Sequence, residues 1–166
     1  LGHQAEAAAA NAQYDRLRSL PRELLAVTNH IHAGRVIRAE EICRHFLRSN
    51  PSNVEGMRLL ARIGLDLGIL EDAEFLLESA VTFEPDNIQL RLDYIDVLRR
   101  RQNFRKAAME ADALYQRDPE SPLFQSRLAI ESMQTGDYDR AFELFGKVLE
   151  ALPNDQLAVK HALTGR

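Results

Sequence analysis

The residue types that most often perform chemistry are sparse in this sequence, and their spacing is poor for catalysis. The five histidines are His3, His30, His32, His45 and His161. His30 and His32 stand two residues apart, so on a helix they point to different faces and cannot share a metal ion. No Gly-rich phosphate loop, Ser-His-Asp pattern or zinc-binding helix signature occurs. We therefore expect no catalytic residues, no metal site and no cofactor.

Cys43 is the only cysteine, which excludes an internal disulfide and a multi-cysteine metal site. It falls at a position that recurs on the core-facing side of the repeat described below. We interpret it as a small buried hydrophobe rather than a reactive thiol.

Positive charge is concentrated in the run Arg99-Arg100-Arg101, with Arg105 and Lys106 shortly after it. Positive charge at the C-terminus of a helix is favourable through the helix dipole, and this is the first interpretation. Contact with an anion or an acidic peptide is the second. Nucleic acid comes third, because the formal net charge of the chain is −4.

The composition is that of one soluble globular domain, with 166 residues, 45% apolar and 28% charged. No apolar run approaches the roughly 20 residues that a membrane helix needs. We predict a cytoplasmic protein with no nucleic-acid or membrane partner. Because the sequence begins at Leu1 rather than Met, we interpret it as a piece of a longer protein.

A fixed interval organises the chain. The four prolines Pro51, Pro85, Pro119 and Pro153 follow one another at steps of 34 residues (85−51, 119−85 and 153−119). Twelve residues before these prolines stand Ala39, Ala73, Ala107 and Ala141. Seventeen residues before them stand Gly34, Gly68, Gln102 and Gly136. A small residue that recurs in a helix indicates close helix–helix approach, and a recurring glycine indicates a helix that ends in a left-handed conformation.

These blocks resemble tetratricopeptide repeats, whose unit is a helix-turn-helix of 34 residues. The closest matches are the segments 136–141 and 152–155, and the resemblance covers residues 20–153. Gln102 departs from the family pattern by replacing the turn glycine of the third repeat, without breaking the phase. The resemblance implies an all-α fold, a right-handed α-α superhelix of four helix-turn-helix repeats with additional N- and C-terminal helices. It also implies a non-catalytic scaffold for protein–protein interaction.

The 34-residue spacing predicts where each helix and each repeat begins and ends. The first helix (A) of the successive repeats is expected at 21–33, 54–67, 88–101 and 122–135, and the second helix (B) at 36–49, 70–83, 104–117 and 138–151. The repeats are 20–53, 54–87, 88–121 and 122–155. Residues 1–19 are expected to form a helical lead-in or cap, and residues 156–166 the start of a fifth repeat or a capping helix.

The A helices of such a stack line a concave groove. The residues expected on that face are Leu24, Thr28, Ile31, Arg58, Arg62, Leu65, Leu92, Asp96, Arg99, Ser126, Ile130 and Met133. Among them, the candidate partner-binding residues are Arg58, Arg62, Leu65, Asp96, Arg99, Ile130 and Met133. Arginine suits carboxylate recognition, because its planar fork donates two parallel hydrogen bonds. Equally, the three arginines are candidates for ion pairs with Asp66, Asp93 and Asp96 inside the groove.

Two other functions remain open at this point. The chain is a candidate lead domain of a longer bacterial enzyme, for example one of the sulfotransferase-like class. It is also a candidate self-association module, a homo-oligomer joined through an exposed helical end.

Overall fold

The computed structural model describes residues 20–151, which form eight α-helices and no strand. The helices are α2 (Arg22–His32), α3 (Val36–Ser49), α4 (Val54–Leu67), α5 (Leu70–Phe83), α6 (Ile88–Arg100), α7 (Phe104–Arg117), α8 (Pro122–Thr135) and α9 (Tyr138–Ala151). The predicted bounds are confirmed to within one residue at every end. The lead-in predicted for 1–19 and the capping helix predicted for 156–166 lie outside the described residues.

Each A helix passes into its B helix through one residue with a left-handed backbone. The φ angles are +70° at Gly34, +76° at Gly68, +84° at Gly136 and +61° at Gln102. Gln102 is the only non-glycine with positive φ in the described range. The third repeat therefore keeps the turn of the others despite its different residue, at a strain of roughly 1 kcal/mol for the side chain.

Helix starts are fixed by local hydrogen bonds that the sequence supplies. The Oδ1 atom of Asn53 accepts from the backbone N–H of Gly56 at 2.8 Å, which caps α4. Asn87 caps α6 in the same way through Leu90 at 3.3 Å. Pro122 occupies the first turn of α8, where its missing N–H removes no helical bond. The A helices of the second, third and fourth repeats thus each begin with a residue suited to that place.

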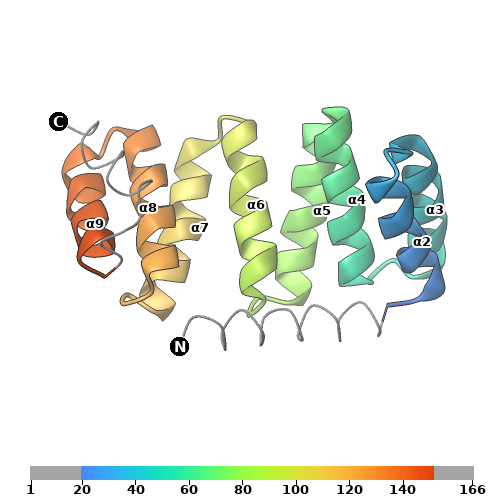
Figure 1. The fold of residues 1–166 in the computed structure, drawn as a ribbon, viewed down its shortest axis with the longest axis horizontal. Helices are drawn as coiled ribbons and strands as arrows, with labels where there is room; N and C mark the ends of the chain where they lie inside the picture. Colours follow the sequence, from blue (N-terminus) through green and yellow to red (C-terminus); the bar gives the residue numbers. More distant parts are fainter. Residues whose placement is uncertain (1–19, 152–166) are drawn as a thin grey trace. The chain divides into compact units, whose positions relative to one another are not determined.

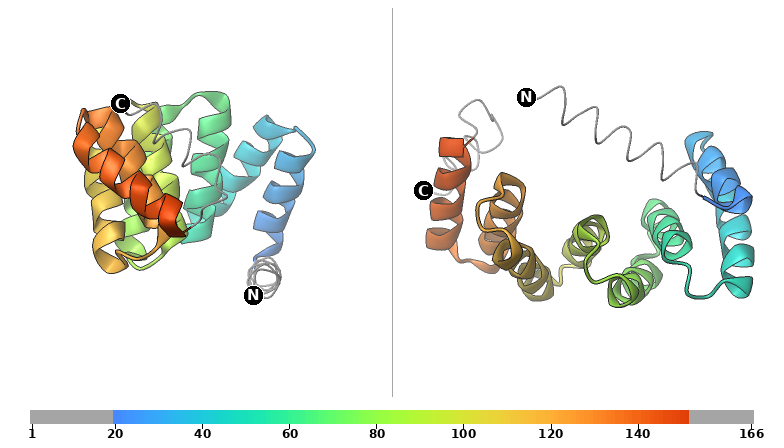
Figure 2. Two further views of the ribbon diagram at one scale, coloured as in Figure 1. Left: turned by 60° about the vertical axis from the view of Figure 1, so that its left-hand side comes forward. Right: turned by 90° about the horizontal axis from the view of Figure 1, so that it is seen from below.

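The chain divides into two units, Leu1–Leu76 and Leu77–Arg166. In the first unit α2 packs against α3, and α3 packs against α4. Figures 1 and 2 show α2 and α3 side by side at the blue end of the ribbon. Their core consists of eight buried residues, which are Leu24, Val27, Ala39, Cys43, Phe46, Leu59, Leu60 and Ile63.

Small residues let the helices of the first unit approach closely. A Cβ atom on Gly56 would lie 2.8 Å from Leu47 Cδ2, so α4 approaches α3 closely here and a larger residue would require the Leu47 side chain to move. The Cys43 thiol donates to the carbonyl oxygen of Gly56 across the same contact at 3.3 Å. Burial raises the pKa of Cys43 to about 12, which keeps the thiol protonated at neutral pH. The interpretation of this residue as a buried hydrophobe is confirmed.

The second unit holds α6 to α9, packed in sequence order, with α7 against α6 and α8 and with α9 against α8. Figures 1 and 2 show α8 and α9 side by side in orange and red. The recurring alanines Ala107 and Ala141 are buried in this unit, as Ala39 and Ala73 are in the first. The expectation of close approach at this repeat position is therefore met in all four repeats.

Ion pairs join successive B helices at one repeated spacing. A residue of one B helix pairs with a residue 28 positions later on the next, and we call this series the B-helix ladder. Its pairs are Arg44–Asp72 at 3.4 Å, Glu78–Lys106 at 2.7 Å and Asp112–Arg140. Exposed pairs of this kind stabilise by only about 0.2–1 kcal/mol each. They identify the face of α3, α5 and α7 that meets the following repeat.

No helix within residues 20–151 combines the length and the apolarity that a membrane crossing requires.

Candidate functional site

The predicted groove residues fall into two sets, one in each unit. Arg58, Arg62 and Leu65 lie on α4 in the first unit. Asp96 and Arg99 of α6 and Ile130 and Met133 of α8 lie in the second. Leu24 and Leu92, also expected on the inner face, were assigned wrongly, because both side chains are buried in the core.

The first set presents positive charge from one side of α4. Arg58 is half-buried and its Nη1 lies 3.4 Å from Glu55 Oε1. Arg62 stands four residues later on the same side of the helix and is exposed. Within residues 20–151 the Arg62 side chain has no ion pair, with Asp66 or with any other residue. Leu65, one turn further, is half-buried.

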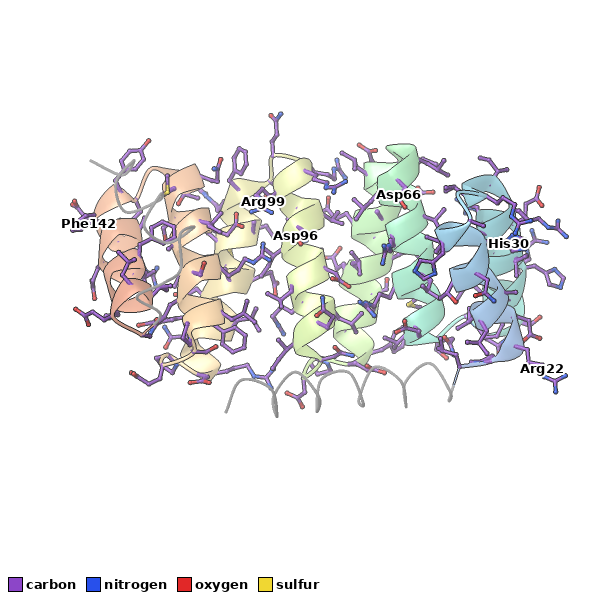
Figure 3. All side chains as sticks on the ribbon, in the orientation of Figure 1. Arg22, His30, Asp66, Asp96, Arg99 and Phe142 are labelled. Carbon is purple, nitrogen blue, oxygen red and sulfur yellow. The ribbon has the colours of Figure 1, made fainter. Side chains whose placement is uncertain are left out.

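The second set contains four charged side chains in contact, which we call the Asp96 cluster: Asp96, Arg99, Arg127 and Glu131. Asp96 Oδ1 accepts from Arg99 Nη2 at 2.9 Å and from Arg127 Nη1 at 2.6 Å. Arg99 Nη1 lies 3.5 Å from Glu131 Oε1, an ion-pair distance without a hydrogen bond. Asp96 therefore holds two guanidinium groups, one from its own helix and one from α8. Figure 3 shows Asp96 and Arg99 on α6.

The four side chains of the Asp96 cluster differ in solvent exposure, from partly exposed to fully buried. The side chains of Asp96 and Arg99 are 39% and 34% exposed, that of Arg127 is 18% exposed and that of Glu131 is fully buried. Two acids and two bases give a net charge of zero when all four are ionised. The outer groups are thus reachable by a partner, while the inner ones fix their orientation.

Glu131 is the unusual member of this cluster. Neither of its carboxylate oxygens has a hydrogen-bond partner within residues 20–151. Burial raises the pKa of Glu131, and the positive charges of Arg99 and Arg127 oppose that rise. One and two repeats earlier, at 131−34 and 97−34, stand Val97 and Ile63, both fully buried. A carboxylate thus occupies a place that is apolar in the two preceding repeats.

Apolar groups adjoin the Asp96 cluster on α8. Ile130 and Met133 are half-buried, and Ser126 is half-buried one turn before Ile130. A partially exposed apolar strip beside fixed charges provides the two ingredients of a recognition surface, area and orientation. Within residues 20–151 no group of three or more His, Cys, Asp or Glu side chains is arranged to hold a metal ion.

Sequence reasoning found half of this cluster and missed the other half. The alternative that Arg99 pairs with Asp96 is confirmed, whereas Arg58 pairs with Glu55. Arg127 and Glu131 were missed, although two signals in the sequence point to them. They stand four residues apart on one helix, and the 34-residue alignment places Glu131 in register with two apolar residues.

The repeat positions and the hairpin geometry together define a helical repeat protein of the tetratricopeptide class. The family model of the cytochrome c-type biogenesis protein H TPR domain matches residues 42–159, well over half of the sequence. The chain therefore belongs to this TPR family.

Solved structures of similar fold include several of MamA. The structure from Desulfovibrio magneticus RS-1 superposes with a TM-score of 0.75 at 12% identity, over 89% of this chain and 85% of that one. A second crystal structure of MamA gives a TM-score of 0.76 at 16% identity, over 86% and 78%. MamA MSR-1 gives 0.71 at 20% identity, over 86% and 82%. A search of curated proteins finds no match in sequence. At these identities the likeness shows the fold.

Proposed function

We propose that this protein is a non-catalytic scaffold that holds a peptide or protein partner against the exposed faces of its A helices. The observation that supports it is the Asp96 cluster. Two arginines share one carboxylate oxygen at the edge of solvent, beside the half-buried Ile130 and Met133. Charged groups held in fixed positions next to apolar area bind with a smaller loss of side-chain entropy than mobile ones. The family's description links its members to cytochrome c-type biogenesis, and we do not extend that process to this chain.

The two sets of residues suit different chemical groups on a partner. Arg62 is exposed and has no ion pair with a described residue, so its guanidinium is available to a partner carboxylate. Asp96 uses Oδ1 for both arginines, which leaves Oδ2 for a partner donor such as a backbone N–H or a lysine. Leu65 offers apolar contact beside Arg62, and Ile130 and Met133 offer it beside the Asp96 cluster. The partner that fits either set is a segment that carries both charged and apolar side chains.

The proposed scaffold role also makes statements about catalysis, cofactors, nucleic acid and cellular location. The scaffold performs no catalysis, binds neither cofactor nor nucleic acid, and acts in the cytoplasm. Support comes from the acidic total charge and from the absence of a nucleophile–base pattern in the sequence.

A matched pair of double variants tests the arginine set. Arg58→Ala with Arg62→Ala removes two charges from the proposed face, while Arg22→Ala with Arg48→Ala removes two from elsewhere in the same unit. We expect the first pair to reduce partner recovery from cell extract by about twofold to thirtyfold, since each exposed charged contact contributes about 0.2–1 kcal/mol. The second pair should change recovery little, and helix content by circular dichroism should match the unmodified chain in both.

Salt supplies a second readout of the same experiment. Recovery by the unmodified chain should fall as salt rises, because partly exposed charges are screened within about 8–10 Å at physiological ionic strength. Equal recovery by both double variants at every salt concentration would contradict the proposed role of Arg58 and Arg62.

A further inference from the structure

The buried carboxyl group of Glu131 is the member of the Asp96 cluster that no partner can touch directly. Its side chain is fully buried, and neither oxygen has a hydrogen-bond partner within residues 20–151. Burying a carboxylate in this way is unfavourable, and Val97 and Ile63 fill the same repeat position with apolar side chains. Packing alone therefore does not account for an acid at this place.

Arg99 connects this buried group to the surface. Its Nη2 donates to Asp96 Oδ1 at 2.9 Å, and its Nη1 lies 3.5 Å from Glu131 Oε1. Arg127 donates to the same Asp96 oxygen at 2.6 Å, so the two guanidinium groups lie close together. The partly exposed part of the cluster thus holds two positive charges against one negative charge. A protonated Glu131 leaves this excess in place, whereas an ionised Glu131 cancels it.

The charged groups of the other helices packed against α8 do not share this environment. On α7, the half-buried Lys106, Glu110 and Asp112 pair with Glu78, Arg91 and Arg140, and Arg105 and Arg117 are exposed. On α9, the charged residues are all exposed: Asp139, Arg140, Glu143, Lys147 and Glu150. The remaining charges of α6 are Arg91, which pairs with Glu110, Asp93, which accepts from Gln89, and the exposed Arg100. The groups that act on Glu131 are Arg99, Arg127 and Asp96, and burial raises its pKa against the pull of the two arginines.

We propose that Glu131 is a protonation switch for the partner site: Arg99 and Arg127 bind a carboxylate of the partner tightly when Glu131 is protonated, and weakly when it is ionised. This role rests on the proposed scaffold function and names the chemical group that the second set of residues takes. An ionised Glu131 engages Arg99 and repels an incoming carboxylate, whereas a protonated one does neither. By the same repulsion a bound carboxylate favours the protonated form, so binding takes up a proton.

The sign of the pH dependence identifies the partner group. The folded-state pKa of Glu131 is raised above its ordinary value of about 4.5. A partner carboxylate should bind more weakly as pH rises through that folded-state pKa. A partner lysine on Asp96 would bind more tightly over the same range, because an ionised Glu131 attracts it. A bound charge that shifts the pKa of Glu131 by about half a unit to one unit changes the affinity about threefold to tenfold.

A peptide titration followed through the backbone amide NMR signals of α6 and α8 tests the switch in the 166-residue chain. The probe is acetyl-Leu-Asp-Leu-amide, whose leucines can contact Ile130 and Met133, and the asparagine analogue is its uncharged match. Free aspartate has a pKa of about 3.9, so the probe stays ionised between about pH 5 and pH 8. We expect it to bind about threefold to tenfold more weakly at pH 8 than at pH 5. Equal binding of both peptides at pH 5, or tighter binding of the aspartate peptide at pH 8, would overturn the proposal.

Glu131→Gln separates the switch from packing, because the amide has nearly the size of the carboxyl group and stays neutral. This variant should bind the aspartate peptide as tightly at pH 8 as the unmodified chain does at pH 5. Glu150→Gln is the control: Glu150 is exposed on α9, so the pH dependence should stay that of the unmodified chain. Titrating histidines affect both variants alike. A Glu131→Gln variant that keeps the full pH dependence would overturn the switch.

Failure of the switch and failure of the scaffold function give different results. An aspartate peptide that binds at neither pH, together with intact partner recovery in the double-variant assay, overturns the switch alone. Peptide binding as predicted, together with no recoverable partner, contradicts the scaffold function alone. Circular dichroism checks that Glu131→Gln folds, and the comparison of the two peptides on the unmodified chain decides the proposal if it does not.

Discussion

Replacing Glu131 by valine should stabilise the protein, although it removes a charged residue that has an ion-pair partner. The change copies the residue that the preceding repeat carries at the same place, Val97, which is fully buried. It removes a carboxylate with no hydrogen bond to either oxygen among the described residues. Arg99 keeps its 2.9 Å bond to Asp96 and remains 34% exposed, so the loss of Glu131 does not leave a buried unpaired cation.

The expected gain is about 1–2 kcal/mol in the free energy of unfolding at pH 7. A buried polar group without a hydrogen bond costs about 1–3 kcal/mol, and the valine side chain removes that cost. We take the lower part of that range, because the variant gives up the 3.5 Å attraction between Arg99 and Glu131. Glu150→Val is the matched control, since Glu150 is exposed on α9 and surface changes stay within about 0.5 kcal/mol.

The gain should depend on pH in a defined direction. The pKa of Glu131 in the folded state is raised above its ordinary value of about 4.5. The folded protein therefore binds more protons than the unfolded chain between these two pKa values. The stability that Glu131 contributes is fully present below the ordinary pKa and is lost as pH rises through the folded pKa. The advantage of Glu131→Val over the unmodified chain should thus be larger at pH 7 than at pH 4.5.

Urea denaturation followed by circular dichroism at the two pH values measures both effects. A variant that is less stable than the unmodified chain at pH 7 would refute the reasoning, because it would show that the carboxylate stabilises through Arg99 by more than its burial costs. An advantage that is the same at both pH values would refute the assigned direction of the pKa shift.

Three further changes test other parts of the fold. Ala107→Leu should lower the free energy of unfolding by about 1–3 kcal/mol in a urea titration, because Ala107 is fully buried between helices. The control Met109→Leu should leave it unchanged, since Met109 is exposed. Equal effects of the two changes would show that the 34-residue alignment of the repeats is shifted. Gln102→Gly should raise the melting midpoint by relieving a positive φ worth roughly 1 kcal/mol, and a lowered midpoint would contradict the strain. Cys43 should react with a thiol reagent only after denaturant is added, since its pKa is raised to about 12; rapid labelling of the native protein would contradict its burial.

Most of the fold was predictable because particular residue types recur at fixed positions of tetratricopeptide-type repeats, and each type reflects a local feature of the backbone or the packing. Alanine twelve residues before each proline marks close approach, and a left-handed turn five residues earlier marks the end of helix A. Gln102 shows that the phase is carried by many positions together, since its turn has the same left-handed backbone as those at Gly68 and Gly136.

The charged cluster was harder to predict because its contacts join different helices. Asp96 and Arg127 are 31 residues apart, and their bond depends on how α8 packs beside α6. Side-chain burial adds a second difficulty, since Glu131 looks like any other helical acid until its register with Val97 and Ile63 is considered. The register of repeats therefore carries site information as well as fold information.

Photo-cross-linking in cells tests the central claim, that the A-helix face holds a protein partner, most directly. A photoreactive phenylalanine analogue at Met133 reports on the A-helix face, and the same analogue at Met109 reports on an exposed B helix. The account predicts a discrete cross-linked protein of another chain from position 133 that is absent from position 109. It also predicts loss of that product when Asp96 is changed to Ala. Cross-links to a discrete partner from position 109 alone would contradict the account and move the partner to the B-helix side.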